Sequence, residues 1–235
     1  MNTSRATRPI PLALTALIAF FSALAALAVS NGHDALAHGN EPHAAAVVAH
    51  TPTTETRKAV ALRTDMRRLW EDHITWTRLA IISLTTGSPD TEATVARLLK
   101  NQTDIGNAVK PFYGTAAGNE LTRQLRQHIL IAAEVVGAAK AGDAMKLADA
   151  QARWTRNGDA IAEVLASVNP RFWKPTAMKA ELRTHLRLTT DEAVARLQGD
   201  WHADVAAYDK IHAHALHMSD LLAAGIVKQF PKRFR

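Results

Sequence analysis

The stretch DKIHAHALHM, from Asp209 to Met218, places three histidines and one methionine within ten residues. The chain has no cysteine, so histidine, methionine, carboxylates and water are the only metal ligands available to it. Neutral imidazole suits zinc, copper, iron and nickel alike, so the residue types alone do not select one metal. The same histidines could instead form a pH-sensitive group or belong to a histidine-rich helix without a special role.

A helical wheel at about 100° per residue predicts which histidines face the core. In the last predicted helix, His212 shares the apolar face, whereas His217 is expected on the opposite side and His214 on the flank. Three other predicted helices each carry one histidine within an apolar stripe and near the middle of the helix, namely His73, His128 and His185. Mid-helix positions of antiparallel helices meet at one level, so four imidazoles are expected to converge on one layer.

Two interpretations of this layer remain open. In the first, His73, His128, His185 and His212, supported by Glu192, bind a transition metal (zinc, copper or iron) or another small ligand. In the second, the histidines are purely structural and hydrogen-bond to Thr77, Thr189 and Tyr208, and the protein is a noncatalytic interaction module of the cell envelope.

No motif of a known enzyme class supports a catalytic interpretation. A di-iron centre needs Glu-x-x-His on two helices, but Asp209 in DKIH is the only acid three residues before a core-face histidine. The chain also lacks G-x-S-x-G, a P-loop, a dinucleotide fingerprint and H-E-x-x-H. We therefore predict no catalytic residues.

The periodicity predicts an all-α fold, an antiparallel six-helix bundle built from helical hairpins. The expected helices are Leu62–Thr86, Thr91–Val109, Gly118–Ala141, Ala144–Val168, Thr176–Gln198 and Trp201–Val227. Asp143 and Asp200 each follow a glycine, as expected where one helix stops and an N-cap starts the next. Polar interruptions near apolar faces, including Asn101 and Asn157, predict hydrogen bonds between helices or entrances to the site.

An internal repeat supports the hairpin design. LRQH, which ends at His128, and LRTH, which ends at His185, are offset by 57 residues, as are the two Gly-Asp turns. Two hairpins of common design are therefore expected to be pseudo-symmetric in space.

The N-terminal region is expected to direct export. Residues 1–37 combine Arg5 and Arg8, an apolar run and a small-residue cleavage site, which predicts a signal peptide, with an uncleaved membrane anchor as the alternative. Residues 38–58 predict a flexible linker, and residues 59–235 the bundle domain. The protein is thus expected in the periplasm or outside the cell.

The charge pattern gives little indication of a macromolecular partner. The formal net charge is +6, and the basic residues are scattered rather than gathered into a stripe with aromatics, so no nucleic-acid partner is expected. A weak peripheral association with the anionic envelope is the alternative.

Several segments resemble a family of small, mostly exported bacterial helical proteins that has no established activity. They include LWEDHITWTRLAIIS, KNQTDIGNAVKPFYG, WTRNGDAIAEVLASVNP and IHAHALHMSDLLAAGIVKQFP, and the resemblance spans about Leu62 to Pro231. It implies an all-α fold and export but adds no mechanism. Members are sometimes labelled glycosyltransferase, yet this sequence lacks the α/β nucleotide-binding pattern and the acidic metal motif of sugar-nucleotide enzymes.

Overall fold

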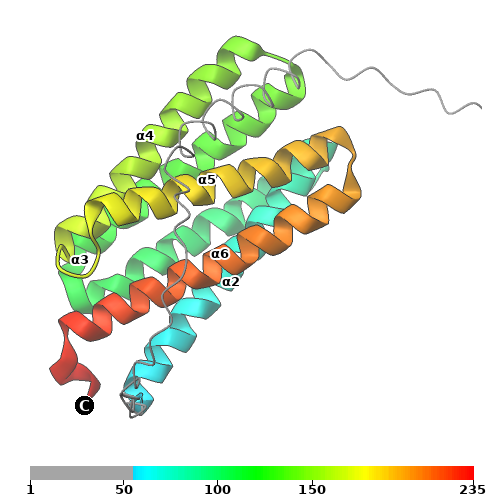
Figure 1. The fold of residues 1–235 in the computed structure, drawn as a ribbon. Helices are drawn as coiled ribbons and strands as arrows, with labels where there is room; N and C mark the ends of the chain where they lie inside the picture. Colours follow the sequence, from blue (N-terminus) through cyan, green and yellow to red (C-terminus); the bar gives the residue numbers. More distant parts are fainter. Residues whose placement is uncertain (1–54) are drawn as a thin grey trace, which may run out of the picture.

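The computed structural model describes residues 55–235, and within this range the protein is all helical, with no strand (Figure 1). The helices are α2 (Arg57–Thr86), α3 (Thr91–Ala141), α4 (Ala144–Val168), α5 (Pro175–Gln198) and α6 (Trp201–Gln229), followed by a short 3-10 helix, η1 (Pro231–Phe234). The expected signal peptide and nearly all of the expected linker lie outside the described residues.

The first helix begins at Arg57, inside the expected linker and before the predicted start at Leu62. Thr56 has an extended backbone, and its side-chain oxygen accepts a hydrogen bond from the Ala59 amide. This cap satisfies one of the free N–H groups at the start of α2 and fixes where the helix starts.

The predicted helix count differs from the observed one, because α3 covers both the second and the third expected helix. Pro111 lies inside α3, and only Gly114 departs from helical geometry, with φ 85° and ψ 167°. The sequence KPFYG therefore interrupts the helix without an intervening loop. The chain bends sharply there: Arg126 donates to the carbonyl of Leu99, and a Cβ on Gly106 would lie 2.7 Å from the carbonyl oxygen of Gly118.

Both predicted Gly-Asp turns are confirmed. Gly142 and Gly199 adopt the left-handed conformation with φ 73° and 70°, which ends α3 and α5. Asp143 and Asp200 then cap the following helices by accepting from the backbone amides three residues later. Equivalent positions of the sequence repeat thus have equivalent local structures.

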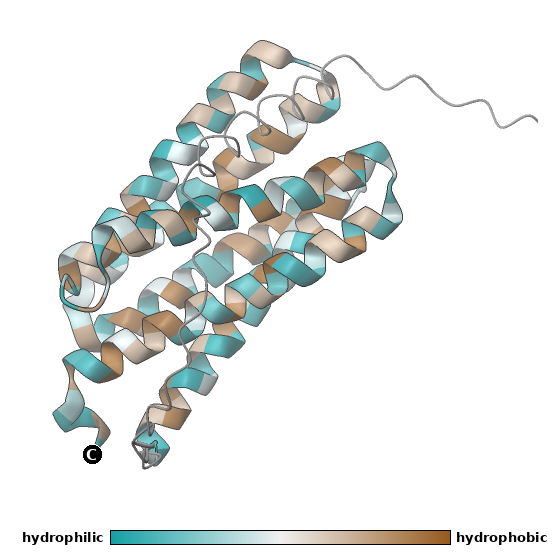
Figure 2. Ribbon diagram, in the orientation of Figure 1, coloured by the Kyte–Doolittle hydropathy of each residue, from teal (hydrophilic) through white to brown (hydrophobic). Residues whose placement is uncertain are grey.

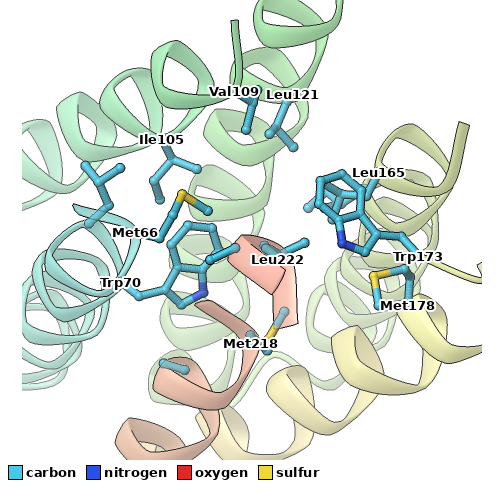
Figure 3. Packing of buried hydrophobic residues seen from close by; sticks show 14 of the residues in the cluster. Met66, Trp70, Ile105, Val109, Leu121, Leu165, Trp173, Met178, Met218 and Leu222 are labelled. Carbon is cyan, nitrogen blue, oxygen red and sulfur yellow. The ribbon is translucent and has the colours of Figure 1, made fainter. Parts of the chain in front are cut away.

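The helices pack in a ring that encloses the core. Each helix contacts the next in the chain, and α6 also contacts α2, which closes the ring (Figure 1). Apolar residues face neighbouring helices while polar residues gather on the outside (Figure 2). Figure 3 shows part of the largest buried cluster, in which Met66 and Trp70 of α2 lie near Met218 and Leu222 of α6.

Candidate histidine site

Three of the four predicted core histidines meet inside the ring. His73 of α2, His128 of α3 and His185 of α5 are 7%, 4% and 6% exposed. The ring centroid of His185 lies 5.7 Å from that of His73 and 6.0 Å from that of His128. We call these three residues the histidine layer, with His185 between the other two.

The protonation of the His128 ring is fixed by Asn157 of α4. The side-chain amide of Asn157 donates to the backbone and side-chain oxygens of Gln124, so its own oxygen must accept from His128. That oxygen lies 2.9 Å from Nδ1 of His128, which therefore carries the proton. The unprotonated Nε2 keeps its lone pair, the arrangement that a supporting amide or carboxylate gives to metal-binding histidines.

The polar groups around His73 and His185 have fewer hydrogen bonds than those around His128. Nε2 of Gln102 lies 3.2 Å from Nδ1 of His73 and also contacts the Leu98 carbonyl and the side-chain oxygen of Asn101. The Gln102 amide has only two hydrogens for these three acceptors, so one acceptor is left without a hydrogen bond from it. Oε1 of Gln102 and Nδ1 of His185 are buried and have no hydrogen-bond partner among residues 55–235. Each such group costs about 1–3 kcal/mol unless a water molecule or ligand satisfies it.

Burial keeps all three imidazoles uncharged. Desolvation, with a smaller contribution from His128, lowers the pKa of His73 to about 3. Burial lowers the pKa of His128 to about 4 although the hydrogen bond that His128 donates to Asn157 acts in the opposite direction, and burial holds the pKa of His185 well below its usual range. The layer is therefore neutral at physiological pH, as imidazole must be to coordinate a metal ion.

The layer lines one end of an internal cavity of about 50 Å³. The rest of its wall is almost entirely apolar and comes from several helices, including Met66, Trp70, Trp173, Met218 and Leu222. A second cavity of about 50 Å³ is lined by Thr77 and Thr189, each one turn beyond a layer histidine. Both are smaller than the cavity of about 150 Å³ that accommodates benzene, and only the first has imidazole and amide side chains in its wall, as partners for a buried water molecule or ion.

The histidine layer does not have the geometry of a metal site as it stands. Within residues 55–235, no three His, Asp or Glu side chains are placed so that they could hold a metal ion as they stand. Imidazoles on one tetrahedral zinc ion, with bonds of about 2.0–2.1 Å, would have ring centroids about 5 Å apart. The observed separations of 5.7 and 6.0 Å would therefore have to shorten by somewhat less than about 1 Å.

The structure does not bring His212 into this layer. Nε2 of His212 lies 2.8 Å from a carboxylate oxygen of Glu71, and both side chains are partly exposed, at 34% and 45%. Viewed along α6, His212 is turned by about 100° from the buried Ile211, which places it at the rim of the α2 contact. The buried stripe of α6 is narrower than the predicted one.

His214, rather than His212, continues the row of histidines from the layer. Its ring centroid lies 6.1 Å from that of His185, and its side chain is only 10% exposed. His217, 60% exposed, follows with its ring 6.4 Å from His214. The outward position expected for His217 is confirmed, while His214 lies closer to the core than expected.

Glu192 is completely buried, but it belongs to a separate ionic cluster. Arg78 of α2 donates to Glu192 over 2.8 Å and to Asp204 of α6, and Arg196 of α5 donates to Asp204 over 3.0 Å. Burial raises the pKa of Glu192 to about 7 despite Arg78. Burial also acts to raise the pKa of Asp204, but hydrogen bonds from Arg78 and Arg196 outweigh it and hold that pKa below its usual range. Thus Glu192 helps to join α2, α5 and α6.

Several important residues had only a weak signal in the sequence. The expected inter-helix hydrogen bonds are confirmed for Asn101, which donates to the Leu69 carbonyl, and for Asn157. Gln102 and Asp204 were not singled out, because a single polar residue on an amphipathic helix is common. For Arg78, the only signal in the sequence is that it directly follows Thr77 of the apolar stripe, so its side chain could reach the core from the edge of that stripe.

Comparison of the chain with protein-family profiles, with curated proteins and with solved structures finds no match. None of the helices within residues 55–235 is both long enough and apolar enough to cross a membrane.

Proposed function

We propose that this is an exported helical-bundle protein that binds a transition metal ion at His73, His128 and His185. The observation that carries the proposal is the convergence of three uncharged imidazoles, from three helices, at the end of one internal cavity. His128 already presents an unprotonated Nε2, and Nδ1 of His185 has no partner among the described residues. A bound ion would turn these uncompensated groups into ligands.

The candidate metals, zinc, copper and iron, can be compared with the residues of the cavity wall. Met66 and Met218 line the same cavity as the three histidines. Thioether sulfur is a soft ligand that favours copper(I), whereas imidazole accepts all three metals. The side chains that line the cavity are thus compatible with copper(I) as well as with zinc.

For the fold, we infer six antiparallel helical segments arranged as a pseudo-repeat. Gly114 divides α3 into two arms that contact each other through Gly106 and Gly118. The repeat unit LRxH then supplies one layer histidine from each hairpin, His128 and His185. His128 and His185 would thus be equivalent positions of the repeat, and together they would supply two of the three histidines of the layer.

The alternative is a noncatalytic envelope module in which the histidines are structural. It is favoured by the side chains that already contact two of them, Gln102 at His73 and Asn157 at His128. A layer of this kind would fix how the helices pair without needing a ligand.

Metal analysis of the full chain, exported from its native host without an affinity tag, tests the proposal. We expect the content of copper or zinc to fall by about one equivalent in His185→Gln. The exposed His202 provides the matched control, because His202→Gln removes a histidine far from the buried layer and should keep the metal. Equal metal content in all three proteins would show that the layer is not the binding site.

A further inference from the structure

Glu181 of α5 lies between two histidines of α6 that are one turn apart. One carboxylate oxygen is 3.8 Å from Nδ1 of His214, and the other is 3.7 Å from Nε2 of His217. Hydrogen bonds of this type are about 2.7–3.2 Å long. The three side chains therefore converge without bonding to one another.

The backbone of Glu181 decides which nitrogen of His214 carries the proton. Nε2 of His214 lies 3.2 Å from the Glu181 carbonyl oxygen, which can only accept, so Nε2 must be the donor. In the neutral ring, Nδ1 then has a lone pair that faces the Glu181 carboxylate at 3.8 Å. Two acceptors that face each other leave a gap in which a cation is favoured.

We propose that His214, His217 and Glu181 form a second binding site, at the protein surface, for a divalent transition metal ion such as zinc or copper(II). Two ligands with bonds of about 2.0–2.1 Å to a tetrahedral ion are about 3.3 Å from each other. The two gaps of 3.7 and 3.8 Å run to different oxygens of Glu181, and the rings of His214 and His217 lie 6.4 Å apart, so the three side chains do not hold an ion as they stand. Binding requires the exposed His217 to rotate until both imidazoles reach one ion beside the carboxylate. Water would fill the remaining position.

The surroundings favour a cation over a proton at this site. Burial lowers the pKa of His214, which disfavours the imidazolium form, although Glu181 acts against that shift. Arg187 is the nearby positive charge that opposes a bound ion, but its guanidinium is paired with Asp191 at 3.2 Å. The main-chain carbonyl of Glu181 orients His214 in the way that outer partners orient metal-binding histidines.

The surface site adjoins the histidine layer but does not depend on it. The ring centroids of His217, His214 and His185 follow one another at 6.4 and 6.1 Å, from solvent to the core. Only the ring of His214 would thus separate an ion at the surface site from His185 of the buried layer. None of the three surface ligands belongs to that layer, so either site can exist without the other.

Calorimetric titration of the full chain with zinc tests this inference. Wild type is compared with Glu181→Gln and with the Glu181→Gln, His217→Gln double variant, both at positions exposed enough to tolerate the change. We expect the double variant to lose one zinc equivalent, and Glu181→Gln alone to weaken that equivalent on the order of tenfold or more, because a charged ligand becomes neutral. His202→Gln should titrate like wild type.

The core variant His185→Gln separates this inference from the proposed function. It should keep the surface equivalent, whether or not the wild-type protein binds a metal ion in the core. If the folded double variant binds as many zinc ions as wild type, with unchanged affinities, the surface site does not exist. That result would leave the proposal for the histidine layer unaffected.

Discussion

The imidazole rings of His73 and His185 lie 5.7 Å apart, although α2 and α5 are not consecutive in the ring of helices and contact each other only over a short stretch. They meet because both side chains point into the interior, where His128 joins them from α3. Placing three neutral imidazoles in an apolar core stabilises the fold only while they stay unprotonated. Proton binding is therefore coupled to unfolding.

The stability of the protein should fall as the pH is lowered below about 6.5. An unfolded histidine has a pKa of about 6.5, whereas burial lowers the pKa of His73 to about 3 and that of His128 to about 4. Between those values the unfolded chain binds the proton and the folded protein does not. Each buried histidine should thus cost up to about 1.4 kcal/mol per pH unit, down to its folded-state pKa.

Urea unfolding between pH 4.5 and 7.5 measures this dependence. His128→Gln keeps a donor for Asn157 and should flatten the pH dependence by about 1.4 kcal/mol per unit below pH 6. His202→Gln, at an exposed position, should leave the curve parallel to that of wild type. A His128→Gln curve that is parallel to the wild-type curve would mean that His128 is protonated in the folded protein.

The buried ionic cluster should contribute far more to stability than an exposed ion pair. Arg78→Leu leaves Glu192 and part of Asp204 without a buried counter-charge, which should cost about 3–5 kcal/mol at neutral pH. Arg67→Leu breaks a pair with Asp220 at the surface and should cost at most about 1 kcal/mol. Equal losses in denaturant unfolding would show that the Arg78 cluster is solvated.

The sequence was sufficient for the all-helical class and for most helix positions, but not for the orientation of α6 about its own axis. Strong apolar periodicity and the Gly-Asp turns predicted the other segments, and they placed His73, His128 and His185 correctly on buried faces. His212 was misplaced because α6 packs against both α2 and α5, so residues on either edge of its buried stripe look equally apolar. Only the neighbouring helices decide that His214 faces His185 while His212 pairs with Glu71.

The boundary inside α3 was unpredictable for a different reason. Pro111 and Gly114 are signals for ending a helix, but the short stretch between them keeps helical geometry. The ionic cluster around Glu192 could not be predicted either. The sequence does not show that Arg78 and Arg196, from different helices, both donate to Asp204.

The bend at Gly114 should depend on glycine. Its φ of 85° and ψ of 167° belong to a region that other residues avoid, so Gly114→Ala should cost about 1–3 kcal/mol. No atom would obstruct a Cβ there, so the loss would come from the backbone alone. Gly137→Ala, also unobstructed but within regular helix, should instead stabilise by about 0.5–1 kcal/mol. Thermal melting of both variants distinguishes a required bend from a flexible one, for which both would be stabilised.

The most direct test of metal binding by the histidine layer is the melting temperature with metal in the Glu181→Gln, His217→Gln background, where the surface ligands are removed. Copper(I) or zinc at a hundredfold excess over its dissociation constant should add about 2.7 kcal/mol of stability at pH 7. The gain should persist at pH 5, because the buried imidazoles stay neutral there, and it should be absent from a folded His185→Gln derivative at either pH. Melting at one temperature with and without every metal tried would contradict the account, and the histidines would then be a structural polar layer.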